Sequence, residues 1–119
     1  MKNLTKAEEQ IIQILWQLDK ASVKEVLSRL PEPKPAITTV STIIRILESK
    51  GFVGHEQIGR GFVYFPLVKK EAYTKFSMRK IINNYFDGSF KNLVSFFAKN
   101  EDIDVNELEE ILKELKKEN

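Results

Sequence analysis

Two capping-box sequences near the start of the chain constrain its fold more than any other feature, because each marks where a helix begins. Thr5 stands three residues before Glu8, and Ser22 stands three residues before Glu25. In a capping box the hydroxyl oxygen accepts from an early helix amide, and the glutamate carboxylate accepts from the amide of the capping residue. Apolar residues follow both boxes at the spacing of a helix face. We therefore expect one short helix after each box.

A third helix and a β-hairpin are predicted to follow. Three prolines between residues 31 and 35 end the second helix, because proline lacks an amide donor and disfavours helical geometry in the preceding residue. Apolar residues return at helical spacing over residues 37–50, and Gly51 suits the left-handed position after a helix. The runs at residues 52–57 and 62–65 flank a turn with two glycines, which predicts a hairpin. Three helices followed by a hairpin are the order of a winged helix-turn-helix head.

Three more helices are predicted in the second part of the chain. Apolar residues indicate one helix over about residues 70–86, and Ser89 and Asp104 can cap two further helices. The expected fold class is mainly α with a small β-hairpin wing. We expect a winged helix-turn-helix head in residues 1–69 and a C-terminal helical dimerisation domain in residues 70–119.

The last 39 residues are too few to bury a core of their own, because segments this short seldom fold without staples, metal or a partner. Their apolar side chains are also too many for one small helical segment to hide. We expect a symmetric homodimer to cover them, and the alternative is that these helices pack back onto the head. The residues assigned to the dimer contact are Phe86, Phe90, Leu93, Val94, Phe97, Leu108, Ile111, Leu112 and Leu115.

The balance of charge changes along the chain. Residues 1–80 hold 14 basic and eight acidic side chains, whereas residues 81–119 hold five and nine. A basic first part favours a polyanionic partner such as nucleic acid. There is no cysteine and no apolar stretch long enough for a membrane span, so we expect a cytoplasmic protein that does not bind membranes directly.

The outward side of the third predicted helix carries the candidate DNA contacts. Opposite its apolar side lie Thr38, Thr42, Arg45 and Ser49, with Thr39 and Ser41 at the flanks. Small hydroxyls let a helix approach the duplex closely and can bond phosphates or base edges, and an arginine can bond guanine with two N–H groups. Arg60, between two glycines at the hairpin tip, is a further candidate for a phosphate or the minor groove. A solvated helix face and a solvated turn are the alternatives.

No residue pattern indicates catalysis or a cofactor. His55 is the only histidine, and the acidic residues lack the spacing of metal ligands, so we expect neither a metal site nor a catalytic triad. His55 is interpreted as an ordinary hairpin side chain. Besides a DNA-binding regulator, two functions stay open: a winged helix that contacts another protein, and a regulator that senses a small molecule between head and tail.

With these features placed, the chain resembles the BlaI/MecI/CopY penicillinase-repressor family across essentially its whole length. The matching segments are Leu4-Thr5-Lys6-Ala7-Glu8-Glu9, Ile14-Leu15-Trp16, Thr39-Val40-Ser41-Thr42-Ile43-Ile44-Arg45-Ile46-Leu47, Lys50-Gly51-Phe52-Val53, Tyr64-Phe65-Pro66-Leu67 and Phe90-Lys91-Asn92-Leu93-Val94. The resemblance implies a dimer whose heads bind two half-sites of a palindromic double-stranded operator. It places DNA contacts at Thr38, Thr39, Ser41 and Thr42.

The resemblance also implies a mode of induction. In the β-lactam-responsive branch of the family, a pathway with a membrane sensor metalloprotease leads to cleavage of the repressor within its dimerisation helices. The matching bond here joins Phe96 to Phe97, where the family pattern has asparagine before phenylalanine. The expected role is therefore repression of a β-lactam-resistance or related operon. Copper-responsive relatives use paired cysteines in the tail, and this chain has none.

Overall fold

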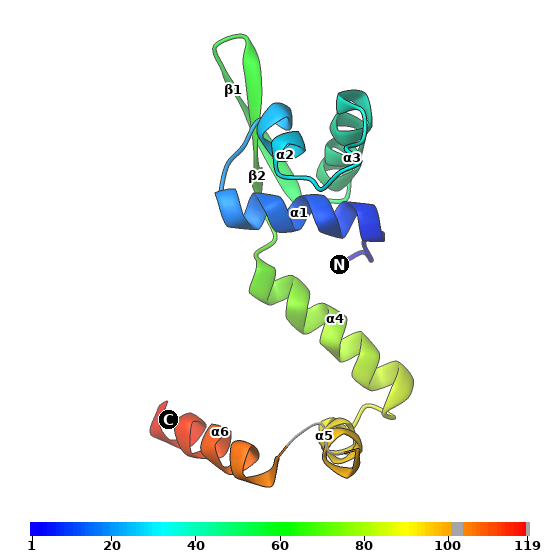
Figure 1. The fold of residues 1–119 in the computed structure, drawn as a ribbon, viewed down its shortest axis with the longest axis vertical. Helices are drawn as coiled ribbons and strands as arrows, with labels where there is room; N and C mark the ends of the chain where they lie inside the picture. Colours follow the sequence, from blue (N-terminus) through cyan, green and yellow to red (C-terminus); the bar gives the residue numbers. More distant parts are fainter. Residues whose placement is uncertain (101–103, 119) are drawn as a thin grey trace. The chain divides into compact units, whose positions relative to one another are not determined.

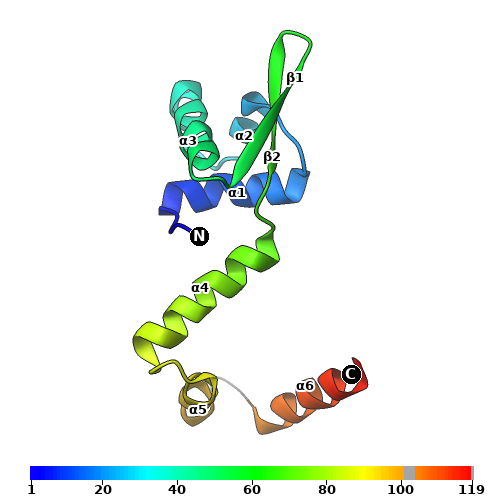
Figure 2. The same ribbon diagram turned by 180° about the vertical axis from the view of Figure 1, so that it is seen from behind.

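The computed structural model describes residues 1–100 and 104–118. Within these residues the chain forms six α-helices and one antiparallel sheet of two strands (Figures 1 and 2). The chain divides into two compact units, Met1–Lys75 and Phe76–Asn119, and the division falls inside the fourth helix. No helix of the described residues has the length and apolar character to cross a membrane.

The first unit has the predicted order of elements. Its helices and strands are α1 (Lys6–Leu18), α2 (Val23–Ser28), α3 (Ile37–Ser49), β1 (Val53–Ile58), β2 (Gly61–Pro66) and the start of α4 (Lys70–Tyr85). Both capping boxes form: Thr5 Oγ1 accepts from the Glu8 amide at 3.2 Å and Glu8 accepts from the Thr5 amide at 2.8 Å, and Ser22 and Glu25 repeat this exchange. The expectation of a mainly α fold with a hairpin wing is confirmed.

The hairpin is longer than predicted by one residue on either side of its turn. Its register runs from Val53 opposite Pro66 to Ile58 opposite Gly61. The turn therefore contains two residues, Gly59 and Arg60, and Gly59 has a φ of 63° that an L side chain would strain. Gly61 belongs to β2, where it pairs with Ile58, and not to the turn. Arg60 is therefore the one turn residue that has a side chain.

The core of the head lies where α1, α2, α3 and the base of the hairpin meet. Its largest fully buried side chains are Ile12, Leu15, Val26, Val40, Ile44, Leu47, Phe52 and Val53. Figures 1 and 2 show α1 crossing below α2 and α3, with the hairpin rising beside α2. Ala21, just before α2, exchanges two backbone hydrogen bonds with Tyr64 of β2, at 3.0 and 2.8 Å. The hairpin is thus tied to the helices at its base, while its tip extends outward.

The second helix is shorter than the expectation of a helix reaching residue 30. It ends at Ser28, and Lys34 Nζ donates to the carbonyls of Leu27, Ser28 and Leu30 at 2.9–3.1 Å. A cation that bonds the free carbonyls at a helix end stabilises an early stop. Lys34 lies among the prolines, outside any helix, so helical periodicity alone does not reveal this contact.

The beginning of α4 belongs to the head because Tyr73 anchors it there. The Tyr73 hydroxyl donates to Glu9 at 3.0 Å and accepts from the Leu4 amide at 3.3 Å. Its ring lies against Phe52 and Trp16, with centroids 5.6 and 6.2 Å away. These contacts hold the start of α4 in the compact unit Met1–Lys75.

A buried ion pair joins α1 to the end of α3. Glu8 is only 4% exposed, and Lys50 Nζ donates to its two carboxylate oxygens at 2.7 and 3.1 Å. Burial by itself raises the pKa of Glu8, but hydrogen bonds from Lys50 and from the Thr5 amide outweigh it and hold that pKa below its ordinary value of 4.5. The capping carboxylate of α1 is therefore also the partner that fixes α3 against it.

We expect Lys50→Met to lower the free energy of unfolding at pH 7 by about 3 kcal/mol, because it leaves the Glu8 carboxylate buried without its cation, and the partial exposure of Lys50 keeps the loss at the low end for a buried pair. A lowered carboxyl pKa contributes stability above 4.5 that is lost as the pH falls through the lowered value. Urea unfolding should therefore show the difference from wild type shrinking as the pH drops below 4.5. The double variant Glu8→Gln/Lys50→Met should recover part of the loss. A difference independent of pH would rule out this ion pair as the cause.

The second unit contains the rest of α4, α5 (Phe90–Lys99) and α6 (Val105–Glu118). Asp87 and Gly88, both with positive φ, end α4, and Ser89 Oγ accepts from the Asn92 amide at 3.1 Å to start α5, as predicted. Only Ile82 and Leu93 are buried among the described side chains of this unit. Its internal core is therefore small.

Candidate nucleic-acid interface

One side of α3 is open to solvent along its whole length. Val40, Ile44 and Leu47 are buried on the opposite side. The residues predicted to contact DNA lie on the open side: Thr38, Thr39, Thr42, Arg45 and Ser49 are exposed, and Ser41 is half-buried. The helix thus presents its hydroxyls and its arginine as one surface.

The hydroxyls of this surface differ in what they bond. Thr42 Oγ1 donates to the Thr38 carbonyl at 2.9 Å, and Ser49 Oγ donates to the Ile46 carbonyl at 2.8 Å. These two oxygens keep lone pairs that accept hydrogen bonds. In the described part of the chain, the hydroxyls of Thr38, Thr39 and Ser41 form no hydrogen bond with another group of the protein. Those three are free to donate to a phosphate or to a base acceptor.

A groove of about 350 Å³ separates α3 from the hairpin. Its lining comprises Ser22, Val23, Lys24, Ile37, Ser41, Arg45, Gly61, Phe62 and Tyr64. Two of the α3 contacts predicted from the sequence, Ser41 and Arg45, stand on one wall. Lys24 of α2 adds a second cation to the lining, which sequence periodicity does not associate with α3.

His55, interpreted from the sequence as an ordinary hairpin side chain, connects the hairpin to α3. His55 of β1 pairs through Nδ1 with Glu48 of α3. The imidazole also lies edge-on to Phe62, at 5.3 Å between centroids, and beside Tyr64 at 5.8 Å. His55 therefore links β1 to α3 and lies against two of the side chains that line the groove, Phe62 and Tyr64.

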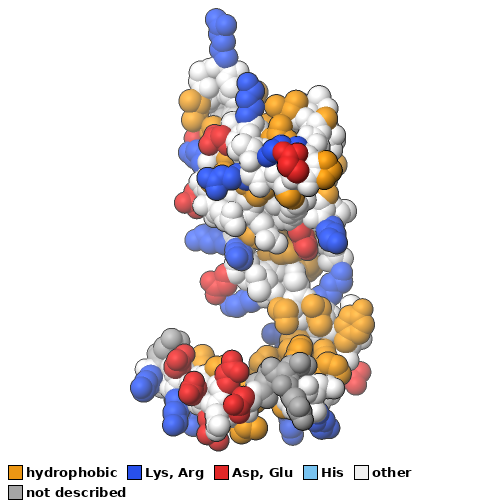
Figure 3. All heavy atoms as spheres, in the orientation of Figure 1, with side chains coloured by type: hydrophobic (Ala, Val, Ile, Leu, Met, Phe, Trp, Pro, Cys, Tyr) orange, Lys and Arg blue, Asp and Glu red, His pale blue; other side chains and the backbone are white. Residues whose placement is uncertain are grey.

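Arg60 reaches the far end of the hairpin. It is exposed and makes no ion pair within the described residues. Figure 3 shows a basic side chain at the end of the hairpin, away from the rest of the head. Nothing in the described chain neutralises its charge, and its contact with DNA stays a prediction.

The start of α3 differs from the starts of α1 and α2. Its capping residue is Ala36, which supplies no side-chain acceptor, and its first turn holds no acidic residue. Among the described residues, no side chain accepts a hydrogen bond from the amides of Ile37 or Thr38. A helix N-terminus carries partial positive charge and attracts phosphate groups. The missing cap is visible in the sequence, because Ala36 stands at a position that serine, threonine, aspartate or asparagine usually fills.

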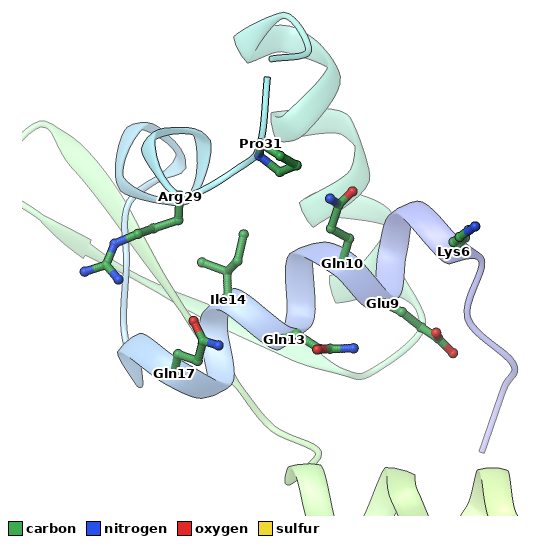
Figure 4. Close-up of a pocket in the computed structure, with 8 residues that line it drawn as sticks. All are labelled: Lys6, Glu9, Gln10, Gln13, Ile14, Gln17, Arg29 and Pro31. Carbon is green, nitrogen blue, oxygen red and sulfur yellow. The ribbon is translucent and has the colours of Figure 1, made fainter. Parts of the chain in front are cut away.

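A second hollow, of about 500 Å³, lies on α1 and the segment after α2. Its lining is Lys6, Glu9, Gln10, Gln13, Ile14, Gln17, Arg29 and Pro31. Figure 4 shows Gln10 pointing toward Pro31, whereas Glu9 and Gln13 point away from it. In ligand pockets a few polar groups converge on the bound molecule, whereas the polar groups that line this hollow do not converge. Among the described residues there is also no cluster of three or more potential metal ligands.

The residues predicted for dimerisation lie in the second unit and are largely uncovered. Phe90 is 66% exposed, and Phe97, Ile111, Leu112 and Leu115 are between 38% and 55% exposed. Phe86, Val94 and Leu108 are half-buried, and Leu93 is buried inside the chain. Figure 3 shows hydrophobic side chains gathered over the end of α4 and over α5.

The bond matched to family cleavage lies inside α5. The carbonyl of the Phe96–Phe97 bond accepts from the Asn100 amide at 3.3 Å and from Asn100 Nδ2 at 2.7 Å. The ring of Phe96 lies 5.6 Å from that of Phe86 and 5.7 Å from that of Phe97. Proteases cut extended chain, so this bond is protected unless the end of α5 unwinds.

Comparison with known proteins identifies the family. The model described as "Penicillinase repressor" matches residues 4–117. The penicillinase repressor of Bacillus licheniformis is 26% identical over 95% of this chain and 91% of its own length, and the methicillin resistance regulatory protein MecI of Staphylococcus aureus is 28% identical over 91% and 89%. A solved structure titled "CopR Repressor Structure" has a TM-score of 0.48, with 33% identity, covering 57% of this chain and 100% of its own. Because the family match spans nearly the whole chain, the protein belongs to the penicillinase repressor family, a family of transcriptional repressors and not of enzymes.

Proposed function

We propose that this protein represses transcription as a cytoplasmic homodimer, with each head bound to one half-site of a palindromic DNA operator. The observation that carries the proposal is the open side of α3, where hydroxyls and Arg45 lie beside a groove closed by the hairpin. A major groove admits one α-helix, and α3 has its core side fully covered by its own head.

Each part of this surface has a role in DNA binding. The hydroxyls of Thr38, Thr39 and Ser41 bond phosphates or base edges, and Arg45 bonds a guanine through two N–H groups. Thr42 accepts a hydrogen bond, since its proton is given to its own helix. Arg60 reaches a phosphate or the minor groove beyond the wing. The bare N-terminus of α3 adds phosphate attraction to these contacts.

A second copy of the chain is the partner for the tail. On α6, Leu108, Ile111, Leu112 and Leu115 follow the spacing of one helix stripe, with three of them about half exposed. Acidic and basic side chains both flank that stripe, so two copies can face each other without a clash of like charges. A symmetric pair covers these side chains and those of α5 with a single surface.

Induction by proteolysis is part of the proposal. A pathway with a membrane sensor metalloprotease would act on the Phe96–Phe97 bond after the end of α5 unwinds. Cleavage there separates α6 from the head and removes the dimer stripe. The repressed genes would then be those of a β-lactam-resistance or related operon.

Selection of bound duplexes from a random pool tests the proposal. The expected product is a palindrome with two identical half-sites, bound with an affinity that falls linearly with salt on logarithmic axes, because phosphate contacts release counterions. A half-site without a symmetric partner would contradict the dimer. Failure to enrich any duplex, with affinity insensitive to salt, would instead favour a winged helix that contacts protein.

A further inference from the structure

Two isoleucines on α3 lie outside the core of the head and are exposed to solvent. Ile37 is 41% exposed and Ile46 is 40% exposed. Ile37 is the first residue of the helix, and Ile46 lies near its end. The three residues on the wing side of α3 that line the groove are Ile37, Ser41 and Arg45, spaced one helical turn apart. Ile37 is therefore part of the candidate DNA surface, although it has no group that forms hydrogen bonds.

We infer that Ile37 contacts the methyl group of a thymine in each half-site and so determines which base is accepted there. This inference rests on the proposed function and adds a specificity-determining residue to it. Among the base edges in the major groove, the thymine methyl is the apolar group, and apolar side chains recognise it by contact. A side chain without polar atoms gains nothing from a guanine, cytosine or adenine edge.

The position of Ile37 on the helix supports this role. The N-terminal residues of a recognition helix are those that contact base edges in helix-turn-helix proteins. Ser41 and Arg45 continue the same line one and two turns later, so the three side chains meet neighbouring base pairs along the groove. The exposed surface of Ile37 loses its water when the helix is seated, which is favourable against a methyl group.

Deoxyuridine in place of each thymine tests the inference, because uracil lacks only the methyl group. The probes are the duplex recovered from the random-pool selection and versions in which one thymine of each half-site is replaced by uracil. For wild-type protein, one uracil in each half-site should weaken binding by about 15-fold, because the dimer loses two methyl contacts and each methyl-sized group contributes about fourfold. Ile37→Ala should bind the thymine and uracil duplexes with equal affinity. Ile37→Val, a smaller change at the same exposed position, should retain part of the difference.

Ile46→Ala is the matched control, since it removes the same side chain from the same helix at the same exposure. It should keep the full wild-type difference between thymine and uracil at the base pair that Ile37 contacts. A thymine effect that survives Ile37→Ala, or the lack of any thymine effect in wild type, would overturn the inference while leaving operator binding intact. If no duplex is enriched at all, the proposed function fails instead, and the two failures are thereby distinguished.

Discussion

Ending the chain after Asn92 should give a monomer that binds the operator at least 100-fold more weakly than the full chain. The change removes most of α5 and all of α6, including the exposed stripe of Ile111, Leu112 and Leu115. Two linked heads bind a palindrome more tightly than one, because the second head binds at a high effective concentration, and this gain is typically 100-fold or more. The truncated head keeps its contacts and loses only that gain.

Sedimentation and a gel shift measure the two halves of this prediction separately. The truncated chain should sediment as a monomer at micromolar concentration, and a surviving dimer would count against the assignment of the tail. A dimeric coiled coil fused after Asn92 should restore much of the affinity if the loss comes from separation of the heads. If the fusion dimerises but fails to restore binding, the truncation has damaged the head.

Arg45→Ala should weaken operator binding by roughly 30-fold or more while leaving the dimer intact. A bidentate arginine–guanine contact contributes about 1–3 kcal/mol of discrimination, and the dimer loses it in both half-sites. Arg45 is exposed and far from the dimer stripe in sequence, so sedimentation should be unchanged. Arg45→Lys should bind the operator more tightly than Arg45→Ala but less tightly than wild type, because lysine cannot form the bidentate contact with guanine.

Arg29→Ala is the matched control for Arg45. Arg29 is also an exposed arginine of the head, but it lines the hollow on α1 instead of the groove beside α3. The control should bind the operator with wild-type affinity apart from a small electrostatic loss. Equal effects of the two substitutions would show that Arg45 acts through net charge and not through a base contact.

The features predicted correctly from the sequence are those set by neighbouring residues. Thr5 with Glu8 and Ser22 with Glu25 meet within one helical turn, so the starts of α1 and α2 were readable directly. The β-branched and aromatic runs of the hairpin and the glycines of its turn are equally local. The open side of α3 could be predicted from helical spacing, because its buried residues recur every three or four positions and leave the opposite side exposed.

The features that sequence analysis missed depend on residues far apart in the chain. Lys50 reaches Glu8 from 42 residues away, and Tyr73 reaches Glu9 from 64 residues away. No spacing rule pairs such residues, because the fold itself brings them together. Ile37 and His55 were missed for a different reason: each fits a bland interpretation until the groove beside α3 is seen.

The absence of cysteine allows the central contact to be tested with one introduced thiol. Ser49→Cys, at the end of the open side of α3, would carry an iron chelate that cuts nearby DNA, and Gln13→Cys on α1 would serve as the matched control. If α3 lies in the groove, the label at position 49 cuts the bound operator at two positions related by the symmetry of the palindrome, and the label at position 13 cuts little. Cutting from position 13 but not from position 49, with both labelled proteins bound, would show that another face of the head meets the DNA.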